Sequence, residues 1–148
     1  MDVLVEKHNI IIGGFIALMT CVFGKYWFLF GFFLFFNVAD WVTGWMKSRM
    51  AGVENSVAGL KGVVKKLGYW LMILVAFAVS RCFIAMGDVI SVDLSITMGL
   101  GWFVLANLTV NEVRSMLENF VEAGFDVPDI LIKGLDVANK AFNRDKED

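Results

Sequence analysis

Long apolar runs separated by short charged segments constrain this chain more than any other feature of its sequence. The runs cover residues 10–23, 27–47, 67–87 and 94–110. Of the 148 residues, 58% are hydrophobic and 19% are charged, and the mean hydropathy is +0.69. A soluble domain is about 45–50% apolar and about 25% charged. Because the charges collect between and after the runs, the sequence predicts a single all-α domain that is integral to a membrane.

The lengths of the runs predict how many helices cross the bilayer. Runs 27–47 and 67–87 have about the 20 residues that a transmembrane helix needs. The run that starts at residue 94 is at the short end of this range, and we expect its helix to continue to residue 123 as an amphipathic segment. Run 10–23 has about 14 residues, so it either spans the bilayer or lies at its surface. The sequence therefore predicts three or four transmembrane helices.

Gly24 separates the first two runs. A single helix over residues 10–40 would be about 45 Å long, whereas the hydrocarbon core is about 30 Å thick. We therefore expect two helices joined in a tight hairpin. Lys25, Tyr26 and Trp27 are residue types that favour a membrane–water interface.

Basic residues predict the orientation of the chain. Segment 48–66 reads as a basic loop, in which Glu54 is the lone acid. Lys and Arg concentrate in cytoplasmic loops, so we expect this loop and the C-terminus to be cytoplasmic. From Ser56 onward, apolar and basic residues alternate as in an amphipathic lead-in on the bilayer surface. A second amphipathic helix is expected over 128–143. The location of the N-terminus depends on whether 10–23 spans.

Polar residues gather at one end of the apolar runs. Asn37, Asp40, Thr43 and Gly44 lie on one stripe of helix 27–47. An acid in or near a membrane is costly and normally faces protein or water. We expect Asp40 to face the bundle interior, although contact with headgroup water alone stays open. Its predicted partners are Lys65 or Lys66, or the stripe of Asn107, Asn111 and Ser115 on helix 94–123. Glu112, Glu118 and Asn119 of the same helix are further candidate assembly residues.

Small residues indicate candidate helix contacts, because they let two helix backbones approach closely. They are Gly13, Gly14 and Ala17 in the first run, and Ser95 and Gly99, to which Gly101 adds, near the start of the fourth. Arg81 interrupts the third run near its end. We expect its side chain to extend toward water and toward Asp88 or Asp93.

The sequence contains no recognisable catalytic constellation. One histidine, His8, and two cysteines, Cys21 and Cys82, are too few for a zinc site. Phosphate-binding loops, dinucleotide-binding glycine patterns and zinc-protease motifs are absent from the sequence. The basic residues flank apolar runs, where membrane topology already accounts for them. We therefore expect no enzyme activity, no metal or other cofactor, and no nucleic-acid partner.

Four short motifs occur in a fixed order between the apolar runs. They are D-x-x-T-G (Asp40, Thr43, Gly44), a Ser–Gly–Lys segment (Ser56, Gly59, Lys65), N-E-x-x-S-x-x-E-N (Asn111, Glu112, Ser115, Glu118, Asn119) and G-x-x-V-P (Gly124, Val127, Pro128). In this order, and over about residues 10–135, the chain resembles the phage holin family, which includes clostridial toxin-secretion holins. One departure is the tail, which is mixed and acidic overall where holins often end in a strongly basic segment.

The resemblance implies a small multi-pass protein of the host cytoplasmic membrane. Such proteins form homo-oligomers in the lipid bilayer and open lesions or pores, through which an endolysin or another exported protein passes, and bacteriophage-induced host cell lysis (cytolysis) follows. The residues alone leave two other classes open. One is a small channel or transporter, and the other is a membrane scaffold that docks a soluble partner.

Overall fold

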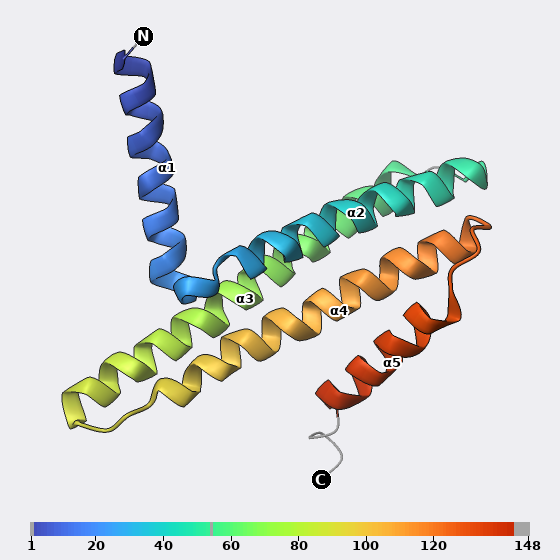
Figure 1. Cartoon of the computed structure of the whole chain (residues 1–148). Helices are drawn as coiled ribbons and strands as arrows, with labels where there is room; N and C mark the ends of the chain where they lie inside the picture. Colours follow the sequence, from blue (N-terminus) through green and yellow to red (C-terminus); the bar gives the residue numbers. More distant parts are fainter. Residues whose placement is uncertain (1, 54, 144–148) are drawn as a thin grey trace.

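The chain folds into five α-helices and two short 3₁₀ turns in the computed structural model, which describes residues 2–53 and 55–143 (Figure 1). The elements are α1 (Asp2–Phe23), η1 (Gly24–Tyr26), α2 (Phe28–Met50), α3 (Ser56–Ile90), η2 (Ser95–Thr97), α4 (Met98–Glu122) and α5 (Asp129–Asn143). No β-strand occurs within this described part of the chain. The predicted all-α fold is confirmed.

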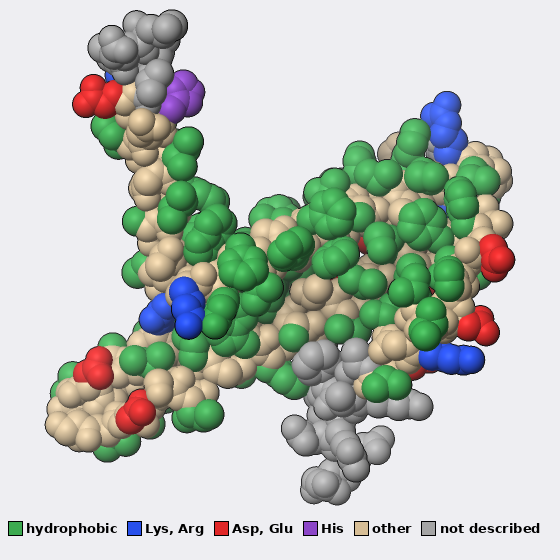
Figure 2. Space-filling view, in the orientation of Figure 1, with side chains coloured by type: hydrophobic (Ala, Val, Ile, Leu, Met, Phe, Trp, Pro, Cys, Tyr) green, Lys and Arg blue, Asp and Glu red, His purple; other side chains and the backbone are tan. Residues whose placement is uncertain are grey.

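Three helices in the described residues are long and apolar enough to cross a membrane, which confirms the expectation of a helical membrane protein. They are the segments Glu6–Tyr26, Phe28–Met50 and Gly59–Ile90 of α1, α2 and α3. Helix α4 is not among these three, because polar residues such as Asn107, Asn111 and Glu112 lower its hydropathy. Hydrophobic side chains nevertheless cover the visible outer surfaces of α1 and α2 (Figure 2).

Helix α4 is the central element of the bundle. It packs along both α2 and α3, whereas α2 and α3 touch each other little. Helices α2 and α4 run in the same direction, α3 runs in the opposite direction, and α5 folds back beside α4 (Figure 1). One end of the bundle therefore carries the α2–α3 connection together with the end of α4. The opposite end carries the turn between α3 and α4.

Helix α1 does not form the predicted tight hairpin with α2. It leaves the bundle steeply at η1 and projects away from it (Figure 1). Gly24 provides the turn with a φ of +73°, which glycine adopts readily. Phe23 is buried against the bundle, and the Arg81 Nε donates a hydrogen bond to the Val22 carbonyl at 3.3 Å. These contacts fix the end of α1 against α3, and they replace the predicted approach of Arg81 to Asp88 or Asp93.

The predicted basic loop over 48–66 is mostly helical. Helix α2 continues to Met50, and α3 begins at Ser56, so the connection is only residues 51–55. The Asn55 Oδ1 accepts the Val57 N–H at 2.9 Å, which satisfies a backbone donor in the first turn of α3. No proline follows before residue 67, so the expected surface lead-in becomes the first three turns of one continuous helix. The helix predicted over 10–23 likewise begins earlier, at Asp2.

The remaining predicted elements differ at their ends. The helix predicted over 94–123 starts at Met98, after the short turn η2, and α5 starts at Asp129. The helix predicted over 27–47 begins one residue later, at Phe28. The helix predicted over 67–87 continues to Ile90. Helix ends are the least certain part of any reading of a sequence.

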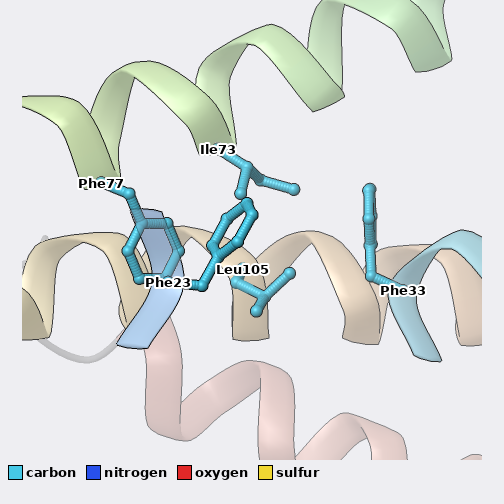
Figure 3. Close-up of a cluster of buried hydrophobic side chains, with 5 residues drawn as sticks. All are labelled: Phe23, Phe33, Ile73, Phe77 and Leu105. Atoms are coloured by element: carbon cyan, nitrogen blue, oxygen red, sulfur yellow. The ribbon is translucent and has the colours of Figure 1, made fainter. Parts of the chain in front are cut away.

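The apolar core lies where α1, α2, α3 and α4 converge. Phe23, Phe33, Ile73, Phe77 and Leu105 form a buried cluster there (Figure 3). The rings of Phe23 and Phe77 meet edge to face with centroids 4.8 Å apart, a favourable arrangement for aromatic pairs. Gly101 permits this packing, because a Cβ at that position would lie 2.7 Å from the Phe77 ring. The core therefore fixes α3 and α4 at close range and anchors the end of α1.

Candidate functional site

A cluster of polar side chains links α2, α3 and α4 at the end of the bundle near the α2–α3 connection. We call it the polar layer, and its members are Asn37, Asp40, Thr43, Lys66, Glu112 and Asn119. The Lys66 Nζ lies 2.9 Å from the Asp40 Oδ2, and it also pairs with the Glu112 carboxylate. The side chains of Lys66, Asp40 and Glu112 are 15%, 14% and 3% exposed. One largely buried ammonium therefore joins three helices.

The ionic part of the polar layer is not electrically balanced. Two carboxylates share the single ammonium of Lys66. Removing charges from water is costly, and the cost is offset only where each charge has close partners. Lys66 supplies this partner to Asp40 and Glu112 at once. Loss of Lys66 would leave two buried negative charges facing each other, whereas loss of Glu112 would leave a matched pair.

Asn119 of α4 connects the polar layer to the D-x-x-T-G motif of α2. Its Nδ2 donates to the Asp40 Oδ1 at 3.0 Å and approaches the Thr43 Oγ1 at 3.3 Å. The Thr43 hydroxyl donates in turn to the Asp40 carbonyl at 3.0 Å. At Gly44, an added Cβ would lie 3.5 Å from the Asn119 Nδ2, an ordinary van der Waals distance, so the two helices are close at this level. Two motifs 79 residues apart in the sequence thus meet in one contact.

Asn37 lies one turn from Asp40 toward the apolar core. Its Nδ2 donates to the Phe33 carbonyl at 2.8 Å, and its Oδ1 accepts the indole N–H of Trp70 at 3.2 Å. Both ends of this buried amide are satisfied, as a polar group in apolar surroundings requires. The bond to Trp70 ties α2 to α3, which otherwise share few contacts.

Other predicted residues lie outside this network. Lys65 is exposed, and its Nζ lies 5.6 Å from the centre of the Tyr69 ring. Asn107 and Ser115 are half-buried, and Asn111 is exposed. Glu118 is exposed and pairs with the Arg114 Nε at 2.9 Å. The predicted polar stripe of α4 is therefore rotated relative to the face that enters the bundle.

A seven-residue spacing marks the face of α4 that does enter the bundle. Leu105, Glu112 and Asn119 are all buried and recur every seven residues. Such spacing is typical of the seam between packed helices. Asn111 and Glu118 have the same seven-residue spacing, so the spacing alone does not single out Glu112 and Asn119 on the sequence.

A groove of about 590 Å³ opens between α2 and α3 over α4. Asp40 and Lys66 contribute to its lining, so the polar layer is reached from outside through this groove. Trp41 and Trp45 stand on the α2 side, and Gly59 and Gly62 on the α3 side.

The expected close helix contact near the start of the fourth run is made by Gly101 against Phe77. Gly13, Gly14 and Gly99 have no described neighbour within 4 Å of an added Cβ, and Ala17 and Ser95 are exposed. A role for these other five positions between copies of the chain stays a prediction.

The polar layer provides ion pairs and hydrogen bonds between helices. Among the residues that the structure describes, no group of three His, Cys, Asp or Glu side chains is placed to hold a metal ion. The arrangement can therefore cross-link helices and hold charge within an apolar bundle.

Comparison with family models identifies one family. The sequence model of the bacteriophage holin family matches residues 17–140. An uncharacterized protein of Listeria innocua is 30% identical over 135 residues, which cover 91% of this chain and 88% of the relative. An uncharacterized protein of Listeria monocytogenes is 30% identical over 118 residues, which cover 80% and 76%. No solved structure matches the chain.

Proposed function

Because this chain belongs to the bacteriophage holin family, we propose that it acts as a holin, which oligomerises in the host cytoplasmic membrane and opens lesions that release an endolysin or a large protein cargo. The observation that carries this proposal is the family match over residues 17–140 of a chain with three helices of membrane-spanning length. The homologues compared are themselves uncharacterized. On this proposal the protein is not an enzyme, and its partners are lipid and further copies of itself.

The proposed topology places the α2–α3 connection and α5 in the cytoplasm. Lys47 and Arg49 in the last turn of α2 support this orientation, since basic residues concentrate on the cytoplasmic side. A cysteine placed at Val53 should react with a membrane-impermeant maleimide only after the cytoplasmic membrane has been permeabilised. Reaction in intact cells would show that the topology is the reverse of the proposed one.

Specific residues of the polar layer have a role in the proposed function. Asp40, Lys66 and Asn119 hold α2, α3 and α4 in one arrangement, and that arrangement shapes the surface that each copy presents to the next. The contact therefore controls assembly through the shape of the subunit. Asp40→Leu removes one of the two acidic partners of Lys66 and the carboxylate acceptor of Asn119 without shortening the apolar helix.

Expression in bacteria tests the proposed function directly. The chain is induced together with a cytoplasmic cell-wall hydrolase, and culture turbidity, membrane potential and hydrolase release are followed. We expect an abrupt collapse after a delay, early collapse on addition of a protonophore, and loss or a marked shift of the collapse time for Asp40→Leu. The matched control is Asp126→Leu in the exposed segment after α4, which should behave as the parent chain.

Three outcomes would contradict the proposal in different ways. Ion leakage without hydrolase release would indicate a small channel. Membrane accumulation without any effect on growth would favour a scaffold. If the Asp40→Leu variant assembles normally and is equally lethal, the polar layer does not control assembly, although the proposed holin function would still stand.

A further inference from the structure

A cationic site lies where α1 meets the bundle, at the end of α2 opposite to the polar layer. We call it the elbow, and it consists of η1 (Gly24–Tyr26) and Arg81 of α3. The Arg81 Nε donates to the Val22 carbonyl, and the Arg81 Nη2 lies 3.6 Å from the position of a Cβ on Gly24. The guanidinium therefore packs directly against the turn. A guanidinium has five N–H donors, and the bond to Val22 uses one of them.

The positive charge of the elbow is not matched by an acid. Among the ion pairs of the described residues, none involves Arg81 or Lys25. The Lys25 Nζ lies 4.8 Å from the centre of the Tyr26 ring, and Arg81 meets the carbonyl end of α1, where the helix dipole is negative. These contacts orient the two cations without neutralising them. Figure 2 shows Lys and Arg side chains gathered at the base of α1.

Amphipathic aromatic side chains surround the elbow. The ring centres of Tyr26 and Trp102 lie 6.1 Å apart, and Trp27 immediately precedes α2. The first turns of α2 beyond this level contain only Phe, Leu and Gly between residues 28 and 36. Tyr and Trp together with cations are typical of the level where hydrocarbon meets headgroups, whereas Phe and Leu are typical of the hydrocarbon itself.

The length of α2 fits a bilayer that begins at the elbow. Helix α2 has 23 residues between the elbow and its end, with Lys47 and Arg49 in the last turn. At 1.5 Å per residue it is about 34 Å long, close to the hydrocarbon thickness of about 30 Å. The elbow and the basic end of α2 are thus about one hydrocarbon thickness apart. Two cationic levels bracket one apolar helix.

We propose that the elbow binds the phosphodiester of a phospholipid headgroup, in the leaflet opposite to the basic end of α2. Arg81 contributes a planar donor set that suits phosphate, and Lys25 contributes a second positive charge. The partly buried Arg81 is fixed by Val22, so little flexibility is lost on binding. The site sets the depth at which the bundle lies in the bilayer. This assignment is independent of lesion formation, because it would hold for any bilayer that the bundle spans.

Binding of phosphatidylglycerol to the full-length chain in detergent micelles tests the proposal, with retained lipid counted by native mass spectrometry. The elbow variant is Lys25→Gln/Arg81→Gln, and the control is Lys7→Gln/Lys133→Gln, which removes the same charge from two exposed positions elsewhere. We expect an affinity loss of about tenfold or more for the elbow variant, which corresponds to about 1.4 kcal/mol. The control should change by less than about twofold.

Two results in this experiment would overturn the assignment. Equal losses in both variants would show that the lipid responds only to overall charge. Inorganic phosphate or glycerol phosphate that displaces the lipid at equal concentration would show a site for a free anion and not for a headgroup.

The depth of the elbow gives a second test that does not depend on Arg81. In phosphatidylglycerol vesicles, the variants Tyr26→Cys and Leu29→Cys are compared in a background with Cys21→Ser and Cys82→Ser. A water-soluble maleimide should label position 26 and not position 29, which lies on α2 beyond the elbow. If position 26 is protected from labelling to the same degree as position 29, the elbow lies in hydrocarbon and the proposed site is refuted. The lysis assay is read separately, so failure here leaves the holin proposal intact.

Discussion

At the residue scale, Lys66 makes the ionic connections that α2, α3 and α4 share. Its ammonium meets Asp40 and Glu112, and all three side chains are at most 15% exposed. Removal of one partner from a buried ion pair typically costs about 3–5 kcal/mol, because the remaining charge is left uncompensated. Since the polar layer opens to the groove between α2 and α3, the lower end of that range applies.

We therefore predict that Lys66→Met destabilises the fold by about 3 kcal/mol. The free energy of unfolding in detergent micelles checks this value. Lys65→Met is the matched control, because Lys65 is adjacent in sequence and exposed, and it should change stability by less than about 0.5 kcal/mol. Addition of Glu112→Gln to Lys66→Met should recover part of the loss. Equal effects at positions 65 and 66 would contradict the ion-pair assignment.

We predict that the stability of the turn between α3 and α4 depends on pH, because of Asp93. The Ser95 N–H donates to the Asp93 Oδ1 at 2.9 Å, and this bond holds the pKa of Asp93 below its ordinary value of 3.8. A lowered pKa means that the interaction stabilises the turn above that value and is lost as pH falls through the lowered pKa. The protection of the Ser95 amide hydrogen from exchange, relative to an unstructured amide at the same pH, should fall over that window. Asp93→Asn should show no such fall, since its side chain does not titrate.

At the scale of elements, the packing of α3 on α4 depends on a single glycine. A Cβ at Gly101 would lie 2.7 Å from the Phe77 ring, whereas Gly99 has open space around it. We predict that Gly101→Ala destabilises the fold by about 1–3 kcal/mol through overpacking. Gly99→Ala should be neutral or stabilising by up to about 1 kcal/mol, because alanine favours the helix. Thermal unfolding of the two variants side by side checks the difference, and equal midpoints would contradict it.

The sequence predicts the number and type of the elements better than their ends and directions. Apolar runs and the D-x-x-T-G motif lead to the helices and to Asp40 with Lys66. The start of α3 does not follow from the pattern, because the basic residues of segment 56–66 indicate a loop. Only the ion pairs of Lys66 with α2 and α4 explain why this segment is helical and packed. The hairpin of α1 and α2 is also wrong, since Phe23 inserts into a core that forms from distant segments. Long-range contacts decide both points.

At the scale of the whole molecule, α1 and the three-helix bundle differ in how much of their surface is covered by protein. Of the 18-residue apolar stretch in α1, 6% is buried by the rest of the chain, whereas 28% of the corresponding stretch in α3 is buried. Lipid or another copy of the chain must cover an apolar helix in this position. Helix α1 therefore provides surface for the environment of the protein, while α2, α3 and α4 provide its internal structure.

The length of α3 has a mechanical consequence for the surrounding lipid. Its apolar span, Gly59–Ile90, has 32 residues and is about 48 Å long, longer than the hydrocarbon core of about 30 Å. A bilayer accommodates such hydrophobic mismatch by stretching around the helix, or the helix tilts, at a cost that grows with each ångström. Two copies that meet share one rim of strained lipid, so clustering lowers the elastic energy without any specific contact. Energy transfer between labelled copies should therefore be strongest in vesicles of short-chain lipids and weaken as the chains lengthen. Transfer that does not change with chain length would show that the membrane adds nothing to the attraction between copies.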